Sequence, residues 1–507
     1  MLERKMSKGW AVCASVSAFL ALLPGCNVGP KYHPPAPPAI KATNYKESTV
    51  NFQDAQGWKV AHPEEAMLRG NWWEIYHEPE LNALEEQLNA HNQTIQISYQ
   101  NYMAARALVL EARAQYWPII TAAPSWRRTR SSSNQVFSTA ATTGRTAGIW
   151  NAPLDVSWTP DFWDKIRNTV RQAQYSAQAT AGDLALERLV EQASLAQFFF
   201  EIRGQDMLQK ILNDTVAADQ KAYDYAEAQY TTGVGDYISV AEADTTLSAA
   251  KASAQAVSLL RAQYEHAIAV LTGQIPTDFS MPVRPLIYTP PAIPTGVPSQ
   301  LLERRPDIAA AERTLAAANA TIGIGYGAFF PNVTIAASAG VQAAIFRQLF
   351  GMPSRTWALG PSVSQLIFEG GLYRAQLHQY EALYNSDLAN YRQTVLTAFQ
   401  QVEDSLVATR VYSQQIVNEQ EAVKSAQSYL NIEMDRYETG VDPYLDVMIA
   451  QNTLLTAQAT LNADQVSEMV SSVQLVQALG GGWDISQLPT PKQTGAKPTK
   501  VDYQMQK

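Results

Sequence analysis

The amino-acid sequence predicts a membrane β-barrel continued by a long α-helical barrel, with two structural repeats in each chain. The first observation is a turn motif that occurs twice, as "AQYTTGVGDYISVAEAD" at 228–244 and "DRYETGVDPYLDVMIAQ" at 435–451. The second is a set of segments in which apolar and polar residues alternate. The third is a pair of long stretches without proline, in a chain that contains 27 prolines.

The N-terminus has the pattern of an export signal that ends at a lipidation site. Basic residues precede an apolar run at 10–23, which leads into "LLPGC" with Cys26 as the cysteine. This resembles a bacterial lipobox, so residues 1–25 are predicted to be a signal peptide and Cys26 to carry lipid. Residues 26–70, which include the Pro-rich stretch 30–40, are predicted to be a lipid-anchored extended segment. The alternative is a plain signal peptide followed by an incidental cysteine.

Each repeat is predicted to contain two strands. In 150–158, every second side chain from Trp150 to Trp158 is apolar, and the side chains between them are mostly polar. This alternation is typical of a membrane barrel, although a soluble sheet with one buried face alternates in the same way. Four strands cannot close a membrane barrel, which needs about eight, so several copies must combine their strands. The strands are expected at about 116–127, 148–159, 331–342 and 356–367.

The helices are predicted from the proline-free stretches, 161–275 and 362–442. A helix from Lys165 to Tyr230 would be roughly 100 Å long at 1.5 Å per residue. The predicted order is therefore a first repeat, a Pro-rich linker, a second repeat and a polar tail without regular structure. These parts span 71–280, 281–300, 301–483 and 484–507.

The repeated motif is predicted to be a tight turn between antiparallel helices, at the end remote from the strands. Gly440 suits the left-handed conformation that ends a helix, and Gly233 is its counterpart in the first repeat. Asp442 is expected to cap the following helix, with Pro443 as its first residue. The predicted tip residues are Gly233, Val234, Tyr237, Gly440, Val441, Pro443 and Tyr444.

Composition and motifs argue against nucleic-acid binding and against catalysis. The net charge is −9, and no cluster of Lys and Arg in the sequence has the pattern of a phosphate-binding patch. "GIGYGA" at 323–328 has the form of a dinucleotide-binding motif, but an Ala-rich helix precedes it instead of a strand. Nucleophile-elbow, P-loop and H-E-x-x-H motifs are absent from the sequence. The chain is therefore predicted to be no enzyme and to have no cofactor or metal site.

Several motifs together resemble the TolC-like outer-membrane efflux channels, in the lipid-anchored NodT/OprM branch that serves resistance–nodulation–division (RND) pumps. They are "LLPGCNVGPKY", "NWWEIYHEPEL", "DFWDKIR", "GVPSQLLERRPDIAAAE", "RYETGVDPYLDV" and "ALGGGW", in that order from Cys26 to Trp483. The resemblance implies a homotrimer with a twelve-stranded barrel in the outer membrane and a helical tunnel through the periplasm.

The resemblance also implies partners and a function. The tip turns would meet a periplasmic membrane-fusion adaptor, and an inner-membrane RND pump would supply the energy. The channel would then passively conduct drugs or other toxic small molecules to the exterior. One alternative is a protein-secretion channel of the same fold, and another is a periplasmic coiled-coil adaptor or scaffold lipoprotein.

Acidic residues near both turns are candidates for a periplasmic gate. Three copies of them would form an acidic ring that favours cations. The alternative is that they are solvated charges and caps at the ends of helices. The candidates are Asp224, Glu227, Asp236, Glu433, Asp435 and Asp442.

Overall fold

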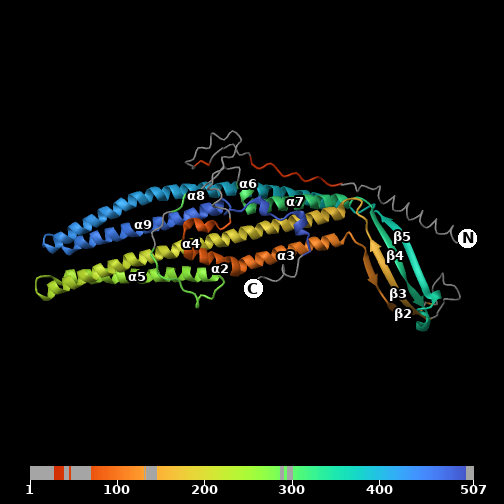
Figure 1. The fold of residues 1–507 in the computed structure, drawn as a ribbon, viewed down its shortest axis with the longest axis horizontal. Coiled ribbons are helices and arrows are strands. Elements are labelled where there is room, and N and C mark those ends of the chain that lie inside the picture. The colour runs from red at the N-terminus through yellow and green to blue at the C-terminus, as the bar shows by residue number, and fades with distance from the viewer. Residues whose placement is uncertain are drawn as a thin grey trace.

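In this computed structural model, a long bundle of helices joins a β-sheet at one end (Figure 1). The predicted signal peptide, Cys26 and most of the predicted anchor segment lie outside the described residues. Among the described residues, no helix is both long enough and apolar enough to span a bilayer. The described residues are 28–38, 45–46, 70–130, 132, 146–285, 290–293 and 301–497.

The two repeats contain main helices whose lengths match one to one. In each repeat these helices have 22, 67 and 35 residues, and a helix of 67 residues is about 100 Å long. Figure 1 shows α4 and α8 running from the sheet to the far end, with α5 and α9 returning beside them. The main helices are α3 (Gln93–Ala114), α4 (Lys165–Thr231), α5 (Tyr237–Leu271), α7 (Pro306–Gly327), α8 (Leu372–Glu438) and α9 (Tyr444–Ala478).

Shorter helices surround the middle of the bundle or follow the strands. The side chain of Trp72, in the first of them, is fully buried and belongs to a core cluster with Phe199 and Phe200 of α4. This core fixes the N-terminal part of the described chain against the longest helix of the first repeat. The short helices are η2 (Trp72–Tyr76), α2 (Pro79–His91), α6 (Leu301–Arg304), η4 (Phe346–Gln348), η5 (Met352–Ser354), η6 (Ile485–Gln487) and α10 (Pro491–Thr494).

The strands of both repeats form one antiparallel sheet in the order β1-β3-β4-β5, with β2 also paired to β3. The first repeat contributes β1, β2 and β3, and the second contributes β4 and β5, so the pairing of β3 with β4 joins the repeats. Within the described chain, β1 with β2 forms one open edge and β5 forms the other. The strands are β1 (Ile119–Ala122), β2 (Ser125–Arg130), β3 (Thr146–Trp158), β4 (Asn332–Ala343) and β5 (Arg355–Ser364).

One face of this sheet is apolar and exposed. The register places Leu154 opposite Ala339, and Ala339 opposite Trp357, on the same face. Leu154 is 49% exposed and Trp357 is 81% exposed. The other face carries Asp155 and its partner Ser338. A large exposed apolar face on a sheet with open edges needs a partner that covers both.

The strand bounds correct the prediction in one respect. The first predicted strand, 116–127, is divided into β1 and β2 by Ala123 and Pro124, so the described part of the sheet has five strands and not four. Proline has no N–H to donate and therefore interrupts the ladder at this position. Because β1 and β2 both pair with β3, they still occupy a single position in the sheet. The remaining strands lie within three residues of their predicted bounds.

The repeats approach closely where α4 crosses α9. A Cβ atom at Gly204 would lie 2.3 Å from the Cγ2 atom of Val466, which is too close for any side chain. The side chain of Asn462, one turn earlier on α9, donates a hydrogen bond of 3.1 Å to the carbonyl oxygen of Gly204. The absence of a side chain at Gly204 therefore permits this contact between the two repeats.

The predicted tail does not lack structure throughout, because its described part packs onto the first repeat. Gln178 of α4 donates a hydrogen bond of 2.7 Å to the carbonyl oxygen of Pro489. Arg113 of α3 donates one of 2.6 Å to the carbonyl oxygen of Gly495. Between them, Thr490 caps the short helix α10. Sequence reasoning assigned no structure here because the segment is polar, whereas its backbone carbonyls are held by side chains of the helices.

The described Pro-rich segment, 28–38, has no regular secondary structure and lies along α7. Asn319 of α7 donates a hydrogen bond of 3.2 Å to the carbonyl oxygen of Pro30. The hydroxyl group of Tyr32 donates to the carboxylate of Glu312, which also belongs to α7. This part of the predicted anchor segment therefore follows the outside of the helical bundle.

Candidate functional site at the helical tips

Both predicted turns lie at the end of the bundle that is farthest from the sheet (Figure 1). Gly233 has φ of 77° and Gly440 has φ of 73°, so both adopt the left-handed conformation predicted for them. The N–H of Gly440 donates 3.0 Å to the carbonyl oxygen of Tyr437, and the N–H of Val441 donates 2.9 Å to that of Arg436. These bonds satisfy the last carbonyl groups of α8.

The two turns differ in how the next helix begins. Asp236 caps α5, because its carboxylate accepts a hydrogen bond of 3.0 Å from the N–H of Ser239. In the second turn Pro443 occupies the cap position and α9 starts at Tyr444. The prediction that Asp442 caps α9 is therefore wrong by one residue, and Pro443 precedes the helix. The carboxylate of Asp442 is instead held by the guanidinium group of Arg436.

Tyrosine rings pack within each turn. The ring centroids of Tyr230 and Tyr237 are 5.5 Å apart, and those of Tyr437 and Tyr444 are 5.4 Å apart. Aromatic pairs at this distance stabilise a fold by more than the burial of their apolar surface alone. The two turns are thus built alike, with a tyrosine before and after each left-handed glycine.

Tyr437 also connects the two hairpins. Its ring lies 5.6 Å from that of Tyr225, and its hydroxyl group donates a hydrogen bond of 3.4 Å to the side chain of Gln229. Tyr225 and Gln229 belong to α4, whereas Tyr437 belongs to α8. A small apolar core beside these contacts contains Ala222, Ala226, Val240, Ala243, Tyr444 and Val447.

An ion-paired acidic cluster occurs at the second tip. Carboxylate oxygen atoms of Glu433, Asp442 and Asp446 lie within 4.8 Å of one another, a spacing that could hold a cation. Hydrogen bonds from Arg436 hold the pKa of Asp442 below its ordinary value. Burial and the charge of Asp442 raise the pKa of Glu433. Sequence reasoning missed Asp446, which lies in the first turn of α9 and so faces back toward Asp442.

The remaining acidic candidates lie near the tips but do not join this cluster. Asp224 accepts a hydrogen bond of 2.9 Å from Gln220 on its own helix, and Asp236 serves as the cap of α5. Glu227 and Asp435 are exposed. The structure therefore brings together two of the six predicted gate residues, Glu433 and Asp442.

A buried acid between the hairpins was not predicted. Asp219 of α4 is only 2% exposed, and neither of its carboxylate oxygens accepts a hydrogen bond from the described residues. Burial raises the pKa of Asp219 from 3.8 to about 6. Burial and the neighbouring charge of Asp219 also raise the pKa of Tyr444. A carboxyl group in this setting is favoured in its neutral form.

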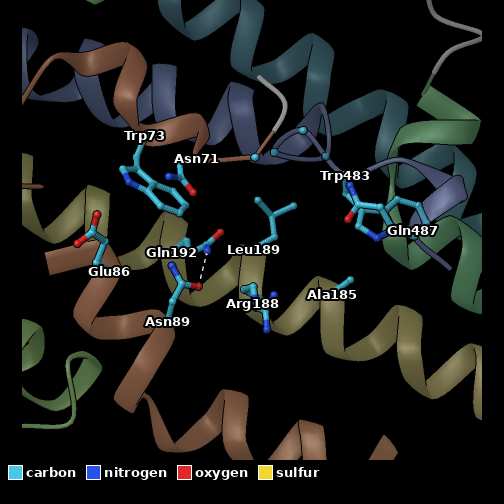
Figure 2. A pocket seen from close by; sticks show the side chains of 14 residues that line it. Asn71, Trp73, Glu86, Asn89, Ala185, Arg188, Leu189, Gln192, Trp483 and Gln487 are labelled. Atoms are coloured by element: carbon cyan, nitrogen blue, oxygen red, sulfur yellow. Dashed lines mark hydrogen bonds between the residues drawn. The ribbon is translucent and has the colours of Figure 1, made fainter. Parts of the chain in front are cut away.

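The middle of the bundle contains a separate pocket of about 520 Å³. Figure 2 shows the side chains of Trp73, Asn89, Arg188, Gln192 and Trp483 around it. The side chain of Gln192 donates a hydrogen bond of 2.8 Å to Asn89 across its wall. Gln192 lies 39 residues before the end of α4, or about 60 Å from the tip. The pocket contains none of the predicted site residues.

Comparison with known proteins identifies relatives over nearly the whole chain. Residues 84–274 and 297–481 match the family model described as "Outer membrane efflux protein", one match in each repeat. The chain is 30% identical over 471 residues to the antibiotic efflux pump outer membrane protein ArpC of Pseudomonas putida, covering 92% of this chain and 95% of that protein. The same values hold for the toluene efflux pump outer membrane protein TtgC of Pseudomonas putida.

A solved structure with the same fold is that of the outer-membrane channel OprN. It superimposes with a TM-score of 0.79 and 27% sequence identity, covering 90% of this chain and all of that chain. The arrangement of one small sheet at the end of long paired helices is thus shared with a known channel.

Proposed function

Because the chain belongs to the outer membrane efflux protein family, we propose that it is the outer-membrane exit channel of a tripartite efflux system of the RND type. The observation that carries this proposal is the exposed apolar face of an open sheet, continued by helices about 100 Å long. The apolar face of the sheet would contact lipid, and the long helices would extend into the aqueous periplasm. Molecules would pass through without chemical change.

Three copies of the chain are proposed to close the channel. The β1–β2 edge of one copy would pair with the β5 edge of the next, which satisfies the open N–H and C=O groups of both. Each copy contributes four strand positions, so three copies give twelve, with the apolar faces toward lipid. The helices of the three copies would then surround a periplasmic tunnel.

The remaining partners follow from this orientation. Cys26 would carry the lipid that anchors the chain to the outer membrane, and the tip turns at Gly233 and Gly440 would meet a periplasmic membrane-fusion adaptor. An inner-membrane RND pump would supply the energy. The relatives named above are outer membrane proteins of an antibiotic efflux pump and a toluene efflux pump, so we propose that the cargo consists of toxic organic small molecules.

The tip acids are proposed to form the periplasmic gate and its cation preference. The ion-paired cluster around Arg436 supports this role for Glu433 and Asp442. Asp236 already serves as a helix cap, which favours the structural alternative at that position. The gate is therefore proposed to lie at the second turn.

The decisive experiment has two parts. The purified protein should form heat-resistant trimers that conduct ions across a planar bilayer, and a deletion strain should become sensitive to antibiotics or solvents. A monomer without channel activity would contradict the proposal. A strain with unchanged sensitivity but a defect in secreted proteins would favour the protein-secretion channel. Loss of labelled palmitate in a Cys26→Ser variant would test the anchor separately.

A further inference from the structure

The sheet end of the molecule is strongly basic, although the chain as a whole is acidic. The described parts of the sheet and of the loop between β4 and β5 contain five arginines and no lysine, whereas Asp155 is their one acidic residue. No described carboxylate forms an ion pair with these arginines. The chain as a whole has a net charge of −9. The arginines are Arg127, Arg128, Arg130, Arg347 and Arg355.

The register of β2 determines which arginines lie on the apolar face. Trp126 pairs with Trp150, and both belong to the apolar face of the sheet. Since side chains alternate along a strand, Arg128 and Arg130 lie on this same face. Arg127 pairs with Ile149 and lies on the opposite face. The two outward arginines lie about 7 and 13 Å beyond Trp126 at 3.3 Å per residue, toward the end away from the helices.

Aromatic side chains form a row beside these arginines. The ring of Trp150 lies 5.8 Å from that of Trp126 and 5.0 Å from that of Phe346, and Phe346 lies 6.5 Å from Phe350. Phe350 is 77% exposed. Exposed aromatic rows of this kind mark the boundary between the apolar and polar zones of a membrane. We call Trp126, Trp150, Phe346, Arg128 and Arg130 the outer rim.

We propose that the outer rim binds the phosphate groups of lipids in the outer leaflet of the membrane. The proposal rests on the outer-membrane location proposed above. Arginine forms paired hydrogen bonds with phosphate, and its aliphatic stem can lie along an apolar surface while the charge reaches the headgroups. The acyl chains would lie on the apolar face below, against Leu154.

The trimer would enlarge this surface. β5 runs antiparallel to β1 and β2 and begins with Arg355, at the same end of the sheet as Arg130. When the two edges meet, Arg355 of one copy comes beside the β2 arginines of the next. The sequence alone did not single out "SWRRTR" at 125–130 as a phosphate site. Only strand pairing shows that Arg128 and Arg130 share the apolar face and that Arg355 lies at the same end of the sheet.

The test measures binding of lipid A to the purified trimer in detergent by native mass spectrometry. The probes are diphosphorylated lipid A and its dephosphorylated form. The Arg128→Gln/Arg130→Gln variant is expected to bind the diphosphorylated form about 30-fold more weakly, since each arginine near the surface contributes about 1 kcal/mol. Arg127→Gln, on the opposite face of the same strand, should bind like the unmodified protein.

Equal binding of the two lipid forms, or unchanged binding by the double variant, would overturn the proposal. An Arg128→Lys/Arg130→Lys variant, which keeps the charge, should bind more tightly than the glutamine variant. Detection of the intact trimer in the mass spectrum of the glutamine variant shows that this variant is folded. Conductance in a bilayer of zwitterionic lipid tests the channel function separately from the lipid site at the outer rim. A conducting trimer without lipid A selectivity would remove the rim site while leaving the channel function in place.

Discussion

Asp219 of α4 lies beside Tyr444 of α9, so a buried carboxyl group from one repeat faces the first residue of a helix from the other. The hairpins meet here through a small apolar core, with no described hydrogen-bond donor for the carboxylate. The contact between the two repeats at the tip therefore depends on the protonation state of Asp219.

The first prediction concerns pH. Because burial raises the pKa of Asp219 in the folded protein from 3.8 to about 6, its protonated form stabilises the fold fully below pH 3.8. This stabilisation is lost as the pH rises through about 6. Asp219→Asn should therefore increase the free energy of unfolding at pH 7.5 by on the order of 1–3 kcal/mol. The thermal unfolding temperature at this pH should rise accordingly. The unfolding temperature at pH 4 should be nearly unchanged.

Circular dichroism of the helices measures both temperatures. Asp214→Asn, at an exposed position on the same helix, serves as the matched control. If Asp219→Asn lowered the unfolding temperature at pH 7.5, the carboxylate would have a stabilising partner in the assembly and this interpretation would be wrong.

The second prediction concerns the ion pair at the second tip. Arg436→Gln removes the guanidinium charge that lies beside the carboxylates of Glu433, Asp442 and Asp446. We expect a larger conductance and a stronger preference for cations, because three copies of the cluster would surround the tunnel. The reversal potential of single channels in a KCl gradient measures the preference. Arg392→Gln, an exposed change elsewhere on α8, should leave it unaltered.

The third prediction concerns the left-handed glycines. A Cβ atom at Gly440 would contact nothing within 4 Å, so Gly440→Ala introduces only backbone strain. We expect a loss of about 1–2 kcal/mol in unfolding free energy and impaired efflux. Gly440→Asn should cost less, because asparagine tolerates this conformation. Gly360→Ala, which also has free space but not a positive φ, is the control.

The fourth prediction concerns the crossing of α4 and α9. Gly204→Ala inserts a methyl group against Val466 and should destabilise the fold by about 1–3 kcal/mol. The Val466→Ala change should restore part of this loss when combined with it, since the two residues are in contact. A double-mutant cycle with additive effects would show that the backbones can separate at little cost.

Much of the fold could be predicted because its signals are local. The absence of proline over 161–275 leads to α4 and α5, and the recurrence of Gly233 at Gly440 reveals the repeat. Alternation in 150–158 identifies β3 and its apolar face. The division of the first strand was less evident. Whether Pro124 interrupts the strand depends on how the residues on either side of it pair with β3.

The candidate site was predicted less completely, because its features depend on side-chain contacts, two of which join the repeats. Asp219 has the sequence surroundings of a polar helix residue, and only the second hairpin buries it. Asp442 looks like a helix cap until Arg436 is seen to bind its side chain. Tyr437 lies within the repeated turn motif, whereas its hydroxyl group reaches Gln229 of the other hairpin.

The equal lengths of the paired helices have a consequence for assembly. Shifting the positions of Glu433, Arg436, Asp442 and Asp446 back by 207 leads to Ala226, Gln229, Gly235 and Ser239, none of which is charged. A ring of three copies would thus present six loops of similar backbone shape. Loops that carry these charged residues would alternate with loops that lack them. If a partner binds this ring with six identical subunits, three of those subunits must contact charged loops and the other three must contact the loops without these charges.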